Sequence, residues 1–177
     1  MAKKNYLITG VPGAGKTTIC QILTEKGFDA IDTDLYPDFS NWFAKDTGDV
    51  VRRPDEGVAS DWLNQHSYNW DEEVLQQVLD TTGEATFICE SSSNQQVLLD
   101  RFDKVFLLKA DEELILGRLA TRIGTDHYGK TEGERQHVLT WYEAWQDRFI
   151  EQGAIPIDAA RPPGVVADLL LKETGLS

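Results

Sequence analysis

A run of residues near the N-terminus has the composition of a phosphate-binding loop. Gly10, Gly15, Lys16 and Thr17 occupy the fixed positions of the pattern G-x-x-x-x-G-K-[ST]. An apolar run precedes them and an apolar-periodic segment follows, which is the strand–loop–helix setting that the pattern requires. Backbone N–H groups at such glycines form a concave site for phosphate oxygens, and the helix directs its positive end at the same charge. We therefore expect a nucleoside triphosphate to be bound by Gly10, Val11, Pro12, Gly13, Ala14, Gly15, Lys16, Thr17 and Thr18.

Basic side chains complete the expected triphosphate site. Lys16 can reach the β- and γ-phosphates. Arg118 and Arg122 lie four residues apart in an expected helix and so share one face. Their guanidinium groups are suited to clamp the transferring phosphoryl group, although ion pairs with nearby acidic residues are the alternative. We expect Lys16, Arg118 and Arg122 to be catalytic, with Arg118 also binding nucleotide.

Acidic side chains follow two of the expected strands. Asp32 and Asp34 end the second apolar run and are two residues apart, so a strand would place both on one face toward the crevice. One could hold hydrated Mg²⁺ together with the Thr17 hydroxyl, and the other could position or deprotonate an acceptor hydroxyl. The alternative is a solvated pair at a turn. Glu90 ends the third run and either belongs to the metal site or caps the following serine-rich turn.

Two segments exceed the minimal αβ repeat. The segment 36–70 contains three of the five tryptophans, among them Trp42 and Trp62, and its glycines, prolines and charges disfavour one regular helix. It could form an acceptor wall that uses Trp42, Trp62 and Arg53, or a small satellite core. The segment 123–134 contains three glycines between two helices and suggests a lid that brings Lys130 to the nucleotide.

Length, charge and cysteine content limit the possible classes of protein. The 177 residues correspond to one domain spanning 1–177, with a net charge of −13 that disfavours a nucleic-acid partner. Cys20 and Cys89 lie in apolar segments and match no metal-ligand spacing, so we expect buried free thiols in a reducing compartment. No apolar run approaches the length of a membrane span or a signal-peptide core. These features predict a cytoplasmic protein without a membrane partner.

Apolar runs alternate with helical patterns, which predicts an α/β fold with a parallel sheet flanked by helices. The expected strands are 5–9, 30–34, 85–90, 105–109 and 154–157. The expected helices are 16–26, 71–81, 94–101, 111–122, 132–152 and 164–174. Asp111 is expected to cap the fourth helix, and Thr131 with Glu134 to form a capping box at the fifth.

Over nearly its whole length, the chain resembles the small P-loop kinases of the adenylate kinase and shikimate kinase group. The likeness rests on the phosphate loop, the Asp-x-Asp at a strand end, and the arginine pair before a lid. It implies a three-layer fold with a five-stranded parallel sheet in the order 2-3-1-4-5, and ATP with Mg²⁺ as phosphoryl donor. It further implies that Asp32 serves the metal and Asp34 the acceptor, and that Arg161 and Pro162 border the adenine.

The chain departs from that group after the third expected strand. Nucleoside monophosphate kinases have Asp-Gly-(aromatic)-Pro-Arg there, whereas residues 90–94 read Glu-Ser-Ser-Ser-Asn and lack the arginine. The glycine-rich turn of shikimate kinases is absent too. The pattern is more similar to shikimate-kinase-like ATP-binding proteins with a Tyr-Gly-Lys lid, and the acceptor does not transfer.

These observations predict ATP-dependent phosphoryl transfer to a hydroxyl of a small-molecule acceptor, by a monomer or homodimer. The alternative is a nucleotide-dependent switch or ATPase that acts through a protein partner. The compact lid-like segment and the lack of switch motifs favour the kinase. A kinase acting on nucleic-acid ends is disfavoured by the acidic surface.

Overall fold

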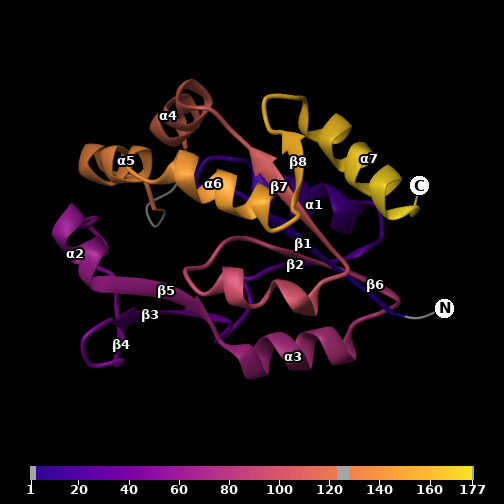
Figure 1. Cartoon of the computed structure of the whole chain (residues 1–177), viewed down its shortest axis with the longest axis horizontal. Helices are drawn as coiled ribbons and strands as arrows, with labels where there is room; N and C mark the ends of the chain where they lie inside the picture. Colours follow the sequence, from indigo (N-terminus) through magenta and orange to yellow (C-terminus); the bar gives the residue numbers. More distant parts are fainter. Residues whose placement is uncertain (1–2, 123–127, 177) are drawn as a thin grey trace.

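The computed structural model describes residues 3–122 and 128–176, and its centre is a five-stranded parallel sheet (Figure 1). The strands lie side by side in the order β2-β6-β1-β7-β8. Counted along the chain within this sheet, that is the predicted order 2-3-1-4-5. The strands are β1 (Lys4–Thr9), β2 (Asp29–Asp32), β6 (Ala85–Cys89), β7 (Lys104–Lys109) and β8 (Ile155–Asp158).

The central strands are rich in apolar residues because helices cover both faces of the sheet. Alternate residues of β1 enter two different cores. Ile8 packs on the side of α1 (Lys16–Glu25) and α7 (Pro163–Thr174), whereas Leu7 packs on the side of α3 (Glu72–Thr81). The sheet therefore holds the loops at its carboxyl edge on a rigid base.

The helix boundaries follow the capping residues that the sequence supplies. Asp111 accepts the backbone N–H of Leu114 at 2.9 Å and begins α4 (Glu112–Thr121). Thr131 and Glu134 form the predicted capping box at α5 (Glu132–Leu139). Both predictions are confirmed.

Two predicted helices differ in the structure. The expected helix 132–152 is two helices, α5 and α6 (Tyr142–Glu151), because the backbone leaves the helical conformation at Trp141, where φ is −134°. The expected helix 94–101 is two short 3₁₀ turns, Gln95–Val97 and Leu99–Arg101.

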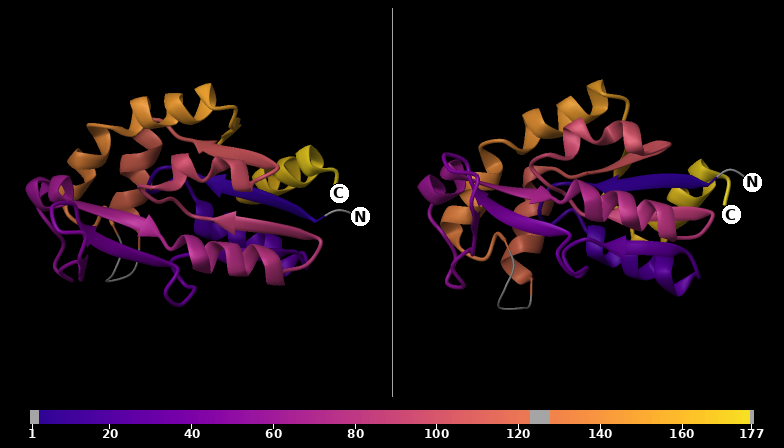
Figure 2. Two further views of the ribbon diagram at one scale, coloured as in Figure 1. Left: turned by 60° about the horizontal axis from the view of Figure 1, so that its bottom comes forward. Right: turned by 90° about the horizontal axis from the view of Figure 1, so that it is seen from below.

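Residues 36–70 form a small insert with its own antiparallel sheet, which the sequence did not predict. Its strands, in the order β4-β3-β5, are β3 (Ser40–Ala44), β4 (Val50–Val51) and β5 (His66–Trp70), and α2 (Ser60–Gln65) precedes β5. Figure 2 shows this sheet at the end of the molecule opposite the two termini.

The two cysteines, Cys20 and Cys89, are buried free thiols, as predicted. Within residues 3–122 and 128–176, every helix is too short or too polar to cross a membrane. The predicted lid includes residues 123–127, which lie outside the described residues.

Candidate active site

The loop from Gly10 to Thr17 connects β1 to α1, so its strand–loop–helix setting is confirmed. Gly13 and Gly15 adopt φ values of +86° and +101°, a conformation that other residues rarely tolerate. A Cβ atom on Gly10 would lie 2.8 Å from the Ala14 side chain. The glycines are therefore required by the curvature of the loop, which lines a large cavity.

Lys16 is folded back over this loop and is 5% exposed. Its Nζ atom donates to the Val11 carbonyl at 3.1 Å and lies 3.2 Å from Oε2 of Glu90. The Thr17 hydroxyl donates to Oε1 of the same carboxylate at 3.1 Å. Glu90 thus neutralises the lysine and orients Thr17, which places it beside the phosphate loop rather than as a cap of the serine-rich turn.

Three carboxylates from the ends of two adjacent strands meet next to Thr17. Oxygen atoms of Asp32, Asp34 and Glu90 lie within 4.8 Å of one another. The sequence predicted this proximity, but the reason it gave was incomplete. Strand β2 ends at Asp32, whose Oδ1 accepts the backbone N–H of Asp34 at 3.0 Å, so a turn and not strand alternation brings the two aspartates together.

This clustering changes the proton affinity of the aspartates. Removal from water and the nearby charges of Glu90 and Asp32 raise the pKa of Asp34 to about 6, although the Tyr68 hydroxyl opposes this by donating to Oδ1 at 2.8 Å. The Asp34 residue is exposed and lines the cavity. Burial and Glu90 also raise the pKa of Asp32. At neutral pH, Asp34 is therefore mostly ionised, and it becomes protonated as the pH falls through about 6.

Tyr68 is a neighbour of Asp34 that sequence reasoning missed. Burial and the charge of Asp34 raise the pKa of Tyr68, so its hydroxyl stays protonated and donates. The serine-rich turn fixes the strand that carries it, because the Tyr68 backbone N–H donates to the Ser93 hydroxyl at 3.1 Å and Ser93 N–H returns a bond to the Tyr68 carbonyl at 2.6 Å. The serine-rich turn after β6 thus anchors the insert. The alternation of aromatic residues in 66–70 is the signal that could have revealed a strand here.

Arg118 and Arg122 come from α4 and both line the cavity. The Arg118 guanidinium donates to the carbonyls of Ala14 at 3.0 Å and Gly13 at 3.3 Å, and to the carbonyl of Ala159 at 2.8 Å. Arg118 thus ties the phosphate loop to the segment after β8, a role that the sequence did not predict. Arg122 lies at the exposed end of the helix.

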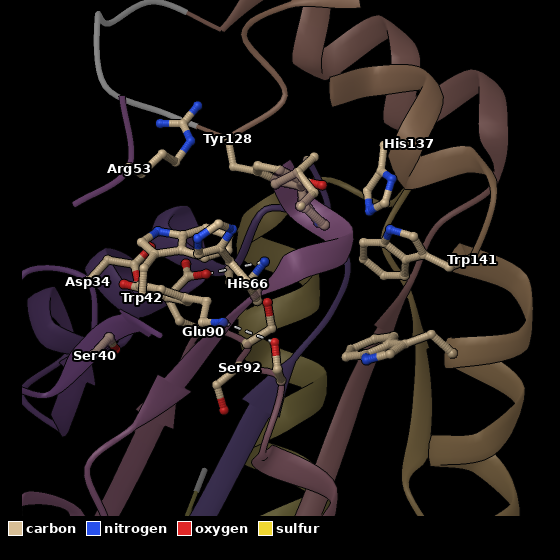
Figure 3. Close-up of a pocket in the computed structure, with 18 of the residues that line it drawn as sticks. Asp34, Ser40, Trp42, Arg53, His66, Glu90, Ser92, Tyr128, His137 and Trp141 are labelled. Atoms are coloured by element: carbon tan, nitrogen blue, oxygen red, sulfur yellow. Dashed lines mark hydrogen bonds and ion pairs between the residues drawn. The ribbon is translucent and has the colours of Figure 1, made fainter. Parts of the chain in front are cut away.

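One cavity of about 1400 Å³ extends from the phosphate loop to the insert and to α5 and α6 (Figure 3). Trp42, His66 and Tyr68 of the insert line one wall. His137, Trp141 and Trp145 line the other. Partial burial and the nearby Lys45 lower the pKa of His137, so this wall carries an uncharged imidazole at neutral pH. Asp34 and Glu90 therefore line a cavity that also has aromatic walls.

The predicted aromatic wall is divided between the cavity and the interior. Trp42 faces the cavity, whereas Trp62 stacks behind it on His66, with ring centroids 3.9 Å apart and 14° between the planes. Trp70 belongs to the core, where its ring packs edge-on against Phe39. Nδ1 of His66 lies 2.6 Å from the Trp62 carbonyl and must donate to it, so Nε2 remains as an acceptor.

The basic residues predicted at the acceptor and lid have partners within the protein. Arg53 lines the cavity and forms an ion pair with Glu134 at 2.5 Å. The Lys130 ammonium donates to the Asp55 carbonyl at 3.0 Å, which joins it to the insert. Nucleotide binding by Lys130 and acceptor binding by Arg53 stay predictions.

A smaller cavity of about 160 Å³ lies behind the phosphate loop, where Arg161 lines it beside Gly15 and Thr18. Pro162, the cap of α7, follows directly in the chain. Adenine contact by Arg161 and Pro162 stays a prediction.

Three solved kinase structures share the fold of this chain. A shikimate kinase from Acinetobacter baumannii in complex with shikimate superposes with a TM-score of 0.60 at 17% identity, covering 98% of this chain and 94% of that one. A deoxyadenosine kinase from M. mycoides with bound dATP gives 0.56 at 14% identity, covering 97% and 99%. A sugar kinase from Janibacter sp. gives 0.54 at 21% identity, covering 99% and 96%.

These identities establish a shared fold. The family is shown by sequence, because the model of the AAA domain family matches residues 7–139, which is more than half of the chain. The chain belongs to this family. No curated protein matches it.

Proposed function

We propose that this protein is a kinase that transfers the γ-phosphoryl group of ATP to a hydroxyl of a small molecule. The observation that carries the proposal is one continuous cavity. It is lined by the phosphate loop, by the carboxylates of Asp34 and Glu90 (the acidic floor), and by aromatic side chains of the insert and of α5 and α6 (the aromatic chamber). A hydrolase needs room only for nucleotide and water. This cavity also provides a separate chamber for a second substrate.

The acids divide into two roles in this proposal. Asp34 accepts the proton of the acceptor hydroxyl, because its side chain faces the cavity and its pKa of about 6 leaves it mostly ionised at neutral pH. Tyr68 holds the carboxylate in place through its 2.8 Å hydrogen bond. Asp34 is the residue on which transfer depends most.

The positive charges stabilise the phosphoryl group. Lys16 exchanges Glu90 for the β- and γ-phosphate oxygens, and Arg122 approaches from the open end of α4. Arg118 keeps the loop curved through its bonds to two loop carbonyls. No proton moves on these three residues.

A Mg²⁺ ion fits the donor set beside Thr17. Asp32 and Glu90 offer carboxylate oxygens and Thr17 offers a hydroxyl, which are the hard ligands that Mg²⁺ prefers, while Asp34 beside them is kept for the acceptor. We propose Thr17, Asp32 and Glu90 as the residues that hold the metal, directly or through water. When bound, the ion would supply positive charge that offsets the negative charge of the phosphate groups.

The insert 36–70 is proposed to bind the acceptor, and the region 123–134 to cover the nucleotide. Trp42 offers a flat surface for an apolar ring face, and Nε2 of His66 accepts a hydrogen bond from a hydroxyl or amine. The structural neighbours are a nucleoside kinase, a shikimate kinase and a sugar kinase, which supports a small polar acceptor.

The test is a screen for ADP release against nucleosides, sugars, cyclic hydroxy acids and amino alcohols, each with ATP and Mg²⁺. The expected result is turnover at least about tenfold above hydrolysis by water with one acceptor class. A protein that binds ATP but shows only the water rate with every class would contradict the kinase proposal.

A further inference from the structure

Glu134 is a fully buried carboxylate, and both of its oxygens accept hydrogen bonds. Oε2 accepts the backbone N–H groups of Gly129 at 3.1 Å and Thr131 at 3.3 Å. Oε1 accepts the Arg53 guanidinium at 2.5 Å and the backbone N–H of Val58 at 3.2 Å. One oxygen thus serves the start of α5, and the other serves the insert.

The charge on this carboxylate is maintained by its partners. Burial alone would raise the pKa of Glu134, but the hydrogen bonds from Arg53 and from backbone N–H groups hold the pKa below its usual value. The Arg53 side chain is only 9% exposed. An ion pair this well buried is costly to break, because the remaining charge loses its partner away from water.

The helix cap does not account for all of these bonds. A capping box needs one side-chain oxygen at the third helical position, and Oε2 fulfils that role. The bonds of Oε1 to Arg53 and Val58 join segments 76 and more positions apart in the sequence. They fix the insert to α5, beside which α2 also packs (Figure 1).

A line of close contacts continues from Glu134 to the phosphate loop. A Cβ on Gly129 would lie 2.8 Å from Leu119 of α4, and a Cβ on Gly13 would lie 3.3 Å from the same side chain. Both glycines also have positive φ, a backbone conformation that residues with a side chain rarely adopt. A side chain at either position would be strained and would press against Leu119. A continuous chain of contacts therefore links the insert to the phosphate loop through Glu134, Gly129 and Leu119.

We propose that Glu134 is a positioning residue that couples nucleotide binding at the phosphate loop to the order of the acceptor-binding insert. This inference rests on the proposed function. Nucleotide that stiffens the loop around Gly13 also stiffens the insert around Val58, and an acceptor bound on the insert strengthens nucleotide binding by the same factor. Bound ATP thereby orders the insert before the acceptor binds.

The test is amide hydrogen exchange of the whole chain, with and without a non-hydrolysable ATP analogue and Mg²⁺. We expect the analogue to slow exchange in residues 10–17 and, by about tenfold, in residues 50–58 of the wild-type protein. In Glu134→Gln, which keeps an acceptor for the cap but loses the ion pair, protection of 10–17 persists and protection of 50–58 falls below about twofold.

A second variant and a control make the result decisive. Arg53→Gln leaves the cap intact and should lose the same protection of 50–58. As a control, Asp103→Asn removes an exposed ion pair between Asp103 Oδ1 and Lys4 Nζ, which lie 2.6 Å apart at the end of β1 away from the phosphate loop. Its pattern of exchange protection should match that of the wild-type protein.

Three outcomes separate the two proposals. Protection of 50–58 that survives in both Glu134→Gln and Arg53→Gln would overturn the coupling role, whatever their melting temperatures. Protection of 10–17 alone in the wild-type protein would overturn it as well. Absence of protection everywhere would instead count against nucleotide binding and so against the proposed function.

Discussion

On one side of the cavity, backbone groups and charges dominate, whereas on the other side aromatic side chains do. The phosphate loop is curved by glycines and held by Arg118, and its only buried cation is already paired with Glu90. The opposite chamber is lined by Trp42 and His66 on a three-stranded sheet of its own. In the proposed function, the first side binds the nucleoside triphosphate and the second selects the acceptor.

The two sides meet at the acidic floor, which belongs to both. Asp32 and Glu90 end strands of the central sheet, whereas Asp34 is held by Tyr68 of the insert. Variants of the three regions should therefore separate into effects on nucleotide, on transfer and on acceptor.

The largest effect is expected at the floor. Asp34→Asn should lower kcat by about 1000-fold, because it removes the general base, while the Kd for an ATP analogue changes less than about twofold. Steady-state kinetics and calorimetry measure the two quantities. Since the raised pKa shows that ionised Asp34 is unfavourable among its neighbours, the variant should melt no lower than wild type at pH 7.5. Retained turnover would remove Asp34 from its proposed role.

Lys16→Ala should damage the nucleotide side alone. It removes a charged contact to the phosphates worth about 3 kcal/mol, so the Kd for an ATP analogue with Mg²⁺ rises roughly 100-fold in calorimetry. Lys16→Ala leaves the buried Glu90 carboxylate without its ion-pair partner, which lowers stability. The double variant Lys16→Ala with Glu90→Gln removes both charges and is therefore the matched control for stability. Unchanged affinity would exclude the loop as the triphosphate site.

The sheet and the loop were predictable because their signals are local. The phosphate loop follows from fixed glycines, and the strands from short apolar runs between helical patterns. The sheet of the insert was not predictable from local signals, because β3 pairs with β5 across more than twenty residues. Aromatic residues also lie on both faces of β3, so this strand lacks a clear alternation of apolar and polar residues. The break between α5 and α6 was missed since the apolar period continues through Trp141, where the backbone leaves the helical conformation.

Within the site, residue types were easier to predict than partners. Asp32, Asp34 and Lys16 were expected near the nucleotide, whereas Glu90 was left between a metal site and a cap, and the four side chains lie together. The ion pair of Arg53 with Glu134 spans 81 positions, and no local pattern reveals such a contact. Tyr68 was missed for the same reason.

The pH dependence of transfer sharpens the role of the floor. With a pKa of about 6, Asp34 becomes the active base as pH rises, so kcat/KM for the acceptor should increase through about pH 6 and fall about tenfold per unit below it. The profile of the residual activity of Asp34→Asn should lack this limb. A wild-type rate that is level from pH 5 to 8 would contradict the assignment.

A smaller effect is expected from the acceptor wall. Trp42→Ala removes a flat ring from the cavity and should raise the KM for the acceptor about tenfold, from the loss of about 1.4 kcal/mol of ring contact. The KM for ATP should stay within about twofold of wild type. An equal rise in both constants would show that the two sides are not separable.

The smallest effect is expected behind that wall. Trp62→Leu leaves the cavity lining in place but removes the ring stacked on His66. The acceptor KM should rise only about threefold, because His66 is less firmly held, with kcat unchanged. A larger effect than that of Trp42→Ala would indicate that Trp62 contacts the acceptor directly.

The most direct test of the account follows the γ-phosphate itself. ATP labelled at that position is incubated with Mg²⁺, the protein and the acceptor class found by the ADP screen, and the products are separated. The account predicts label in a phosphorylated small molecule, and its loss with Asp34→Asn. Label released only as inorganic phosphate, equally in both proteins, would contradict it.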